Sequence, residues 1–341
     1  MYRSSIAPRG VLNPVAGAGR APIRLINGVR NAGVFLVARA TVTVTVAAAG
    51  VLRNRGSVWA LFDEIVLDEN GTDKMIVRGN VLRYASEMVA PSALSAVRAA
   101  LPVAVYALEE AVYLPFADPL SFNPLETAFV EHDARQALNV QFSVNANPVA
   151  KLYTVGGATV VVSAISVTLE QDYETPGQNG ITAPLFIPTI RQQIANVNGD
   201  VTQQPEFLRT TNLIRKIILS QEDSVLGEVS DILRSFALRG DFKPIIGPAP
   251  MTVNDLLLRS EFGFGGAVVS SNRSHVGLNF QRYGQLSECL NPAQDVNLRF
   301  ELSALPSVVG VAAGGTSSVR ITSFELFRDP AVTAPTVPFA Y

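Results

Sequence analysis

The chain has 341 residues, of which 48% are hydrophobic and 16% are charged, and its formal net charge is −2. This length is long for one hydrophobic core and suits two domains. A single cysteine, Cys289, excludes an intramolecular disulfide, and one cysteine with two histidines cannot supply the four ligands of a structural zinc site. The low charge is typical of a surface that faces other subunits, or of a β-rich protein whose surface is polar but uncharged.

Residues 1–32 are predicted to form a basic, extended N-terminal arm. They include Pro8, Pro14 and Pro22 and show no sustained hydrophobic periodicity, so we expect the arm to become ordered on partners rather than through its own packing. The first 62 residues contain eight arginines and no acidic residue, a charge of +8 that leaves −10 for the rest of the chain. Such a segment suits an acidic patch on a neighbouring subunit or a lipid surface, or it simply stays soluble; its arginines are too widely spaced for a nucleic-acid patch.

The first domain is predicted over residues 33–175. Runs of β-branched and alternating apolar residues predict strands near 34–47, 57–67, 73–78, 103–114, 137–145 and 159–172. Apolar residues at helical spacing predict a helix from Asn80 to Ala90, before Pro91, and a second short helix over 92–100, before Pro102.

The most apolar stretch of this domain is Val34 to Leu52, which is the best candidate for a membrane span. It contains Arg39, and from Thr41 to Val46 threonine and valine alternate. Alternation of β-branched residues favours a half-exposed strand over a spanning helix.

A linker is predicted over residues 176–184, where proline and glycine cluster, and a second domain over residues 185–330. Its strands are expected near 184–195, 207–220, 236–246, 276–282, 296–303 and 318–327, with a helix from Val225 to Ser235. Residues 331–341 are predicted to be an extended C-terminal tail. The absence of a βαβ rhythm predicts an all-β fold of two tandem antiparallel jelly-roll sandwiches with short inserted helices and extended terminal arms.

Three blocks of sequence recur in the same order along the two halves. The paired blocks centre on Ile65 and Ile217, on Asn139 and Asn297, and on Val167 and Phe324. The first pair reads as a strand, an acid-rich turn and a short amphipathic helix in both copies. The offset between copies drifts by a few residues, which insertions in surface loops explain. We therefore predict two domains of one architecture.

No residue pattern predicts a catalytic, cofactor-binding or metal site. The two histidines, His132 and His275, lie in polar segments without a nucleophile motif, and a surface-loop histidine is far more often solvated than catalytic. The turn from Asp68 to Asp73 offers oxygen ligands for calcium, but its glycine falls at the fourth rather than the sixth position of an EF-hand loop. An Asn-Gly turn between two strands explains this segment fully.

Two further patterns have simple explanations. The glycine-rich stretch Phe262–Gly266 lacks the Lys-Ser or Lys-Thr pair of a phosphate-binding loop. Glu109 and Glu110 are adjacent in a predicted strand, so their carboxylates point to opposite faces and cannot work as a pair on a glycosidic bond.

The pairs Asp63–Glu64 and Arg215–Lys216 occupy matching places with opposite charge. They could therefore meet across a ring of subunits. Two unrelated exposed strand positions are the simpler explanation.

The two tandem sandwiches, the paired blocks and the basic arm resemble the double jelly-roll major capsid proteins of icosahedral, often membrane-containing, tailless bacteriophages. The resemblance covers residues 33–330 and is one of architecture, without a diagnostic motif. It implies a non-enzymatic capsid protein without a cofactor, which forms homotrimers of pseudo-hexagonal outline in an icosahedral shell. The virion is the expected location, after synthesis in the host cytoplasm.

The same resemblance implies the partners. These are other copies of the chain in the trimer and neighbouring capsomers, minor capsid, vertex or spike proteins, and internal membrane lipid at the basic N-terminal arm, with no sequence-specific nucleic acid. One alternative is a two-domain jelly-roll glycan-binding protein or glycan hydrolase. The single tryptophan, Trp59, weighs against it, because sugar-binding faces usually carry exposed aromatic platforms. A minor capsid or spike protein of the same virion is a third possibility.

Overall fold

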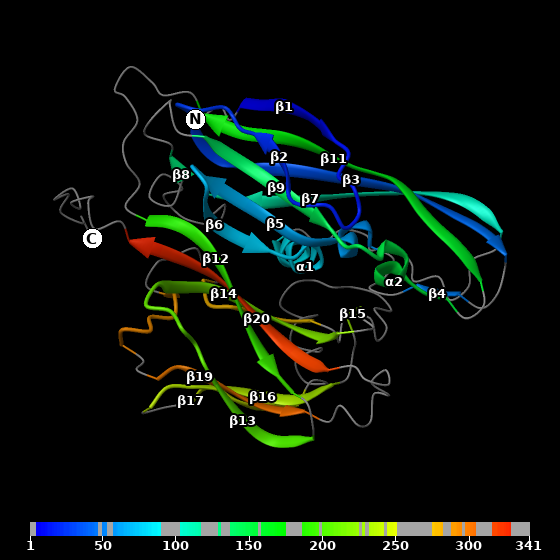
Figure 1. Cartoon of the computed structure of the whole chain (residues 1–341). Helices are drawn as coiled ribbons and strands as arrows, with labels where there is room; N and C mark the ends of the chain where they lie inside the picture. Colours follow the sequence, from blue (N-terminus) through cyan, green and yellow to red (C-terminus); the bar gives the residue numbers. More distant parts are fainter. Residues whose placement is uncertain are drawn as a thin grey trace.

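Two antiparallel sandwiches follow one another along the chain in the computed structural model (Figure 1). The structure describes residues 5–46, 50–52, 57–89, 103–116, 129–130, 137–155, 158–174, 186–197, 200–224, 227–228, 232–241, 244–250, 275–281, 288–294, 297–304 and 316–328. Within these residues, eight main strands build each sandwich. In both, one sheet has the order first-eighth-third-sixth and the other second-seventh-fourth-fifth. Eight strands wound in this way form a jelly roll, so the predicted fold class is confirmed.

The first jelly roll begins at the first described strand of the chain. One of its sheets contains β1 (Ser5–Leu12), β11 (Thr159–Glu174), β3 (Arg30–Val46) and β7 (Ala104–Pro115). The other contains β2 (Ala21–Arg24), β9 (Leu138–Val144), β5 (Phe62–Glu69) and β6 (Thr72–Val77). The connections carry the helices α1 (Gly79–Val89) and α2 (Pro148–Leu152), the 3-10 turn η2 (Val58–Leu61), and the short strands β4 (Gly50–Leu52), β8 (Phe129–Val130) and β10 (Tyr153–Val155).

The second jelly roll repeats this arrangement. One sheet contains β12 (Phe186–Asn196), β20 (Ser317–Arg328), β14 (Leu213–Asp223) and β18 (His275–Asn279). The other contains β13 (Val201–Phe207), β19 (Arg299–Ala304), β16 (Leu233–Arg239) and β17 (Pro244–Pro250). A two-residue strand, β15 (Gly227–Glu228), pairs with β14.

The strands follow from alternation in the sequence. In β9, Leu138, Val140, Phe142 and Val144 are buried while the residues between them are partly exposed. The same period runs through β3, so the segment Thr41–Val46 is a half-exposed strand as predicted. None of the helices within the described residues is long and apolar enough to cross a membrane.

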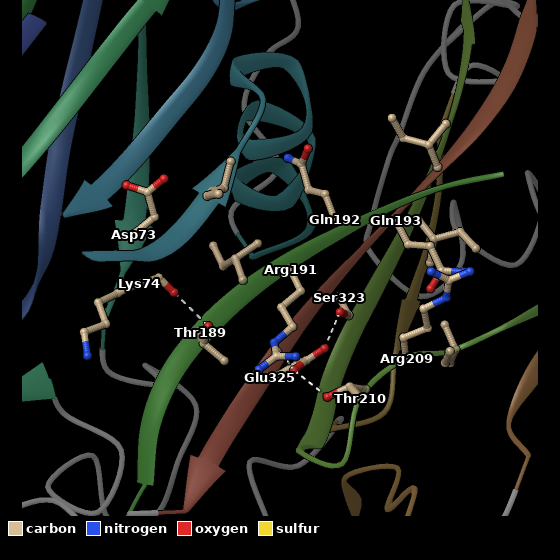
Figure 2. Close-up of a pocket in the computed structure, with 15 residues that line it drawn as sticks. Asp73, Lys74, Thr189, Arg191, Gln192, Gln193, Arg209, Thr210, Ser323 and Glu325 are labelled. Atoms are coloured by element: carbon tan, nitrogen blue, oxygen red, sulfur yellow. Dashed lines mark hydrogen bonds and ion pairs between the residues drawn. The ribbon is translucent and has the colours of Figure 1, made fainter. Parts of the chain in front are cut away.

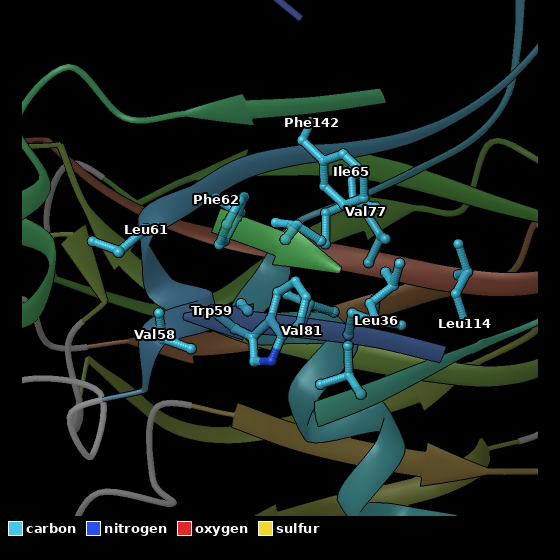
Figure 3. Packing of buried hydrophobic residues seen from close by; sticks show 14 of the residues in the cluster. Leu36, Val58, Trp59, Leu61, Phe62, Ile65, Val77, Val81, Leu114 and Phe142 are labelled. Carbon is cyan, nitrogen blue, oxygen red and sulfur yellow. The ribbon is translucent and has the colours of Figure 1, made fainter. Parts of the chain in front are cut away.

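The core of the first roll is organised around Trp59, which is fully buried in η2 (Figure 3). Its ring lies 5.2 Å from that of Phe62, which in turn meets the edge of Phe142 at 6.1 Å. Helix α1 starts at Gly79, where a side chain would come within 2.3 Å of the Trp59 carbonyl oxygen. From there Val81 and neighbouring apolar residues of α1 enter the core. Burying side chains of this size stabilises the fold by roughly 1.5–3 kcal/mol each.

The two rolls lie side by side and share one sheet. Strands β6 and β12 form a parallel bridge at Met75 and Ile190, so the second sheet of the first roll continues into the first sheet of the second. Ile190, Ile218 and Phe324 of the second roll belong to the hydrophobic cluster of the first. The remaining two sheets lie at opposite ends of the molecule (Figure 1). This joint fixes the two rolls relative to one another.

The predicted N-terminal arm is partly wrong. Ser5–Leu12 pairs with β11 and Ala21–Arg24 pairs with β9, so these stretches are the first and second strands of the first roll. They are extended, as expected, but they gain order from their own chain rather than from a partner. A start of the first domain at residue 33 therefore omits two of its eight strands. The predicted linker and C-terminal tail lie outside the described residues.

The helix predicted from Val225 to Ser235 is also wrong, because its described residues lie in β15, in β16 or directly before β16. Ile232, Leu233 and Phe236 fit helical spacing, but pairing of β16 with both β17 and β19 buries them in the second core instead. The helix predicted at Asn80–Ala90 is confirmed by α1. The short helix predicted over 92–100 lies outside the described residues.

Other element boundaries differ in detail. Residues 58–61, predicted as the start of a strand, form the 3-10 turn η2. The strand expected over 207–220 begins only at 213, since 201–207 is a separate strand, β13. The strand expected over 236–246 is two strands, β16 and β17. The other predicted strands are present within a few residues of their expected ends.

The repeat is real, but one of its three blocks was matched to the wrong strand. β9 and β19 are both seventh strands, and β11 and β20 are both eighth strands, so the blocks around Asn139/Asn297 and Val167/Phe324 are equivalent. In contrast, Ile65 lies in β5, a fourth strand, and Ile217 lies in β14, a third strand. Short apolar strands that precede acidic residues look alike by composition, and only the pairing order separates them.

Candidate functional site

The acidic residues of the turn from Asp68 to Asp73 have structural roles. Asp68 and Asn70 form the tight turn between β5 and β6, where Asp68 Oδ1 accepts from the Gly71 amide at 3.3 Å and Asn70 has a positive φ of 53°. Asp73 accepts from Arg20 at 2.9 Å. The hairpin turn therefore explains this segment as predicted. Within the described part of the chain, no group of three or more histidine, cysteine or acidic residues is placed to hold a metal ion.

Glu109 and Glu110 lie on opposite faces of β7, as predicted. Glu109 is exposed and binds Arg39 Nε at 2.7 Å. Glu110 is mostly buried, where it accepts from Ser57 Oγ at 2.6 Å and pairs with Arg83 at 3.2 Å. Burial raises the pKa of Glu110, and the neighbouring Arg83 charge opposes part of that rise.

His275 does not lie in a solvated loop, which corrects the prediction. It is the first residue of β18, is only 6% exposed, and stacks on Tyr84 of α1 with ring centroids 5.1 Å apart. The pairing of β18 with β14 carries it into the joint between the two rolls. His132 and the glycine-rich stretch 262–266 lie outside the described residues.

The idea that Asp63–Glu64 and Arg215–Lys216 meet across subunits is not supported by their positions. Glu64 already binds Arg20 at 3.0 Å, and Asp63 accepts from Asn145 at 2.6 Å. Arg215 is 8% exposed, so it is not a surface charge. The two pairs also lie on strands that are not equivalent in the two rolls.

A network of buried charge ties the two rolls together. Glu222 of β14 is 5% exposed and receives both Nε and Nη2 of Arg320 on β20, at 2.9 and 3.1 Å. Arg78, which lies between β6 and α1 of the first roll, reaches the same carboxylate at 3.0 Å. Arg320 also donates to Gln192 Oε1 at 3.0 Å. We call Arg78, Glu222 and Arg320 the inter-roll charge cluster.

A pocket of about 780 Å³ opens beside this joint (Figure 2). Its walls come from β6, β12, β20 and the segment after β13. Glu325 lies buried at its side and accepts from Thr210 Oγ1 at 2.7 Å, from Asn212 Nδ2 at 2.8 Å and from Ser323 Oγ at 2.5 Å. Arg191 approaches the same carboxylate at 3.5 Å. The carboxylate is thus held by hydrogen bonds within its own chain, which suits a structural role better than ligand binding.

The most distinctive surface is the outward side of the sheet β1-β11-β3-β7, which we call the first outer face. Its exposed hydrophobic side chains are Ile6, Val11, Phe35, Val105 and Val161, with exposures from 36% to 68%. Exposed apolar groups gathered on one face are typical of interaction surfaces. Sequence reasoning pointed only to a charge-poor surface in general, because the face is assembled from strands whose paired residues lie up to 168 positions apart, as Ser5 and Tyr173 do.

Comparison with known proteins gives a consistent answer at the level of fold. No protein family model matches the chain, and no curated protein matches it by sequence. The chain is similar in structure to the STIV MCP crystal structure, with a TM-score of 0.67, 12% identity, and coverage of 96% of this chain and 97% of that one. STIV is the Sulfolobus Turreted Icosahedral Virus.

Two further solved structures show the same similarity over nearly the whole chain. The major capsid protein P2 of bacteriophage PM2 has a TM-score of 0.57 and 11% identity, with 96% of this chain and 99% of that one covered. The PBCV-1 virus capsid has a TM-score of 0.56 and 10% identity, with 96% of this chain and 94% of that one covered. The structural neighbours are capsid proteins, and the chain has their double jelly-roll fold.

Proposed function

We propose that this chain is a major capsid protein that assembles as homotrimers into the icosahedral shell of a virion. The observation that carries the proposal is the end-to-end match of two joined jelly rolls to viral capsid proteins, which leaves almost none of either chain unmatched. Two similar rolls in each of three subunits make six similar lobes, an outline that tiles a shell. The β-bridge and the ion pair that join the rolls support this role, because a lattice requires subunits of fixed shape.

The proposed activity is assembly, without chemical turnover. Burial of apolar, charge-poor side chains between subunits provides the favourable free energy, as in other stable oligomers. The buried position of Trp59 removes the one tryptophan from any sugar-binding face, so the glycan-binding alternative gains no support from it.

The finer parts of the proposal follow from the resemblance in architecture. The virus would be a bacteriophage, and the chain would be made in the cytoplasm of the host. The chain would contact minor capsid, vertex or spike proteins, and an internal membrane near its basic N-terminal segment. Arg20 and Arg39 are already paired with Glu64, Asp73 and Glu109 of the same chain, so any lipid contact would use other arginines.

The oligomeric state of the purified full-length chain tests the core of the proposal. Light scattering at roughly micromolar concentration should give three times the monomer mass of 36.4 kDa. Electron microscopy of the native particle should show this chain as the repeating component of the shell. A stable monomer, or a particle in which the chain is present in only a few copies, would contradict a major capsid role.

A further inference from the structure

The pocket beside the joint between the rolls runs along one edge of β12. Six consecutive residues of this strand, 189–194, line it, together with parts of β6, β20 and the segment 208–210 (Figure 2). Consecutive side chains of a strand point to opposite faces of the sheet, so a cavity that touches all six residues reaches around the edge of the strand. In Figure 2, Arg191 and Gln192 accordingly lie on opposite sides of the β12 ribbon.

The two edges of β12 are paired very differently. On one edge, β12 pairs with β20 over all 11 residues, from Phe186 to Asn196. On the pocket edge, the only pairing among the described residues is the parallel bridge between Ile190 and Met75. Strand β6 ends at Val77, and the chain then enters α1. Within the described part of the chain, no strand therefore lies beside β12 after Ile190.

The register decides which backbone groups reach the pocket edge. In an antiparallel pair, every second residue exchanges both backbone hydrogen bonds with the partner strand, and the residues between turn theirs away. The Val197 amide donates to the Ser317 carbonyl at 2.8 Å, so odd-numbered residues of β12 face β20 and even-numbered ones face the pocket edge. Of the even-numbered residues, Ile190 forms the bridge to β6, and the Asn196 carbonyl accepts from Gln204 Nε2 at 3.1 Å.

Gln192 and Ile194 therefore direct their backbone N–H and C=O groups to the pocket edge. Neither residue pairs with a described strand there, and Nε2 of Gln192 is also buried without a hydrogen-bond partner among the described residues. Pro188 fits the same register, because it lacks an N–H and occupies an even-numbered position. Free backbone groups at a strand edge are a template for another extended chain.

The side chains of the pocket favour a negatively charged ligand. The acidic residues already have partners, because Asp73 binds Arg20 at 2.9 Å and Glu325 is held by hydrogen bonds within the second roll. Arg209 is exposed and has no ion pair among the described residues. Arg191 lies 3.5 Å from Glu325, and 56% of its side chain is exposed. The charge available in the pocket is therefore positive, which suits an acidic partner.

We propose that the free edge of β12 binds an extended segment of another protein, in which acidic and apolar residues alternate, as an added strand. Such a strand places every second side chain on the face of Arg191 and the others on the face of Ile194. Arg209 lies on the face of Arg191, because the adjacent Thr210 bonds to Glu325 there. Acidic side chains then reach the two arginines, and apolar ones cover Ile194, which is 51% exposed. This site goes beyond shell assembly, because it recruits a different protein.

A fluorescent peptide tests the site on the full-length native protein. At about 3.3 Å per residue, about seven residues of alternating glutamate and valine span the lining of β12. Fluorescence anisotropy should show saturable binding, and lysine in place of glutamate should weaken it by about tenfold or more. N-methylation of one set, the valines or the glutamates, should abolish binding and that of the other should not, because only one set turns its amides to β12. Absence of saturable binding, or equal binding of both methylated peptides and the unmodified one, would overturn the proposal.

Matched variants of the protein test the same edge from the other side. Ile194→Pro removes the N–H that faces the pocket and keeps the pairing with β20, whereas Ile194→Thr keeps this N–H. Ile194→Pro should weaken peptide binding by about tenfold or more, and Ile194→Thr should bind nearly as the native chain does. Arg209→Ala should weaken binding about threefold to fivefold, and Arg234→Ala, at an exposed arginine of β16 outside the pocket, should not.

Circular dichroism shows whether each variant is folded, and the methylated peptides decide the matter on the native protein if Ile194→Pro does not fold. Equal binding to folded Ile194→Pro and Ile194→Thr would overturn the proposal, since the backbone of β12 would then not take part. Equal losses in Arg209→Ala and Arg234→Ala would also overturn it, because the peptide would then bind by general charge attraction.

Discussion

Removal of the Glu222 carboxylate should destabilise the protein strongly, because it leaves two arginines without their shared partner. Arg320 is only 8% exposed, and its side chain makes two hydrogen bonds to Glu222, at 2.9 and 3.1 Å. Removing one member of a buried ion pair lowers the stability of the fold by about 3–5 kcal/mol. Arg78 is more exposed, so its ion pair with Glu222 adds little to that cost. We expect Glu222→Ala to lower the free energy of unfolding by about 3–5 kcal/mol.

Urea unfolding followed by fluorescence measures this effect, since Trp59 is the only tryptophan and lies in the core of the first roll. Because the inter-roll charge cluster joins the rolls, loss of Glu222 in the second roll should shift the Trp59 transition as well as the circular dichroism transition. The comparison is made at fixed protein concentration, since association stabilises the folded state. The double variant Glu222→Met with Arg320→Met should recover most of the loss, because an apolar pair replaces the charges. A loss of unfolding free energy below about 1 kcal/mol, or a double variant less stable than Glu222→Ala, would refute this reasoning.

Three further changes give defined outcomes. Gly33→Ala places a methyl group 2.4 Å from Tyr113 Oη and 2.8 Å from the backbone carbonyl oxygen of Leu114, so it should cost about 1–3 kcal/mol in urea unfolding; a neutral result would contradict this close packing. Burial raises the pKa of Glu110 above its ordinary value of 4.5, so its contribution to stability is present below pH 4.5 and is lost as the pH rises through the raised pKa. The free energy of unfolding, measured at a series of pH values, should therefore depend less on pH in Glu110→Gln than in the native chain. An equal pH dependence in the two proteins would contradict this prediction. Tyr84→Leu removes ring stacking on His275 and should lose about 0.5–1.5 kcal/mol more than Tyr84→Phe, which keeps the ring; equal losses would contradict the stacking.

Local patterns predicted much of the fold because β-strands with one buried face must alternate. The valines and leucines at every second position of β3 and β9 predicted those strands closely, and the spacing of Val81, Leu82 and Ala85 predicted α1. The same rule failed at Ile232, Leu233 and Phe236, where apolar residues fit helical spacing but lie in or beside a strand. Short apolar runs satisfy both periods, and the partner strands decide between them.

The candidate surface was harder to predict than the strands. Composition indicated a protein with little surface charge, but not where apolar side chains gather. Val105 and Val161 become neighbours only because β7 and β11 both pair with β3. Likewise, His275 and Arg215 look like polar surface residues in the sequence, but both are buried in the structure.

By itself, the sequence determined most of the strands, that the chain contains two similar halves, and that few residues are available for chemistry. Only the tertiary structure decided which strand is which, and so that the first described residues belong to the first roll rather than to a free arm. The physical reason is that jelly-roll sheets are built from pairs distant in sequence, such as Val11 with Thr168 and Leu36 with Leu169. Alternation fixes which face of a strand is apolar, but hydrogen bonds to distant strands select its neighbours.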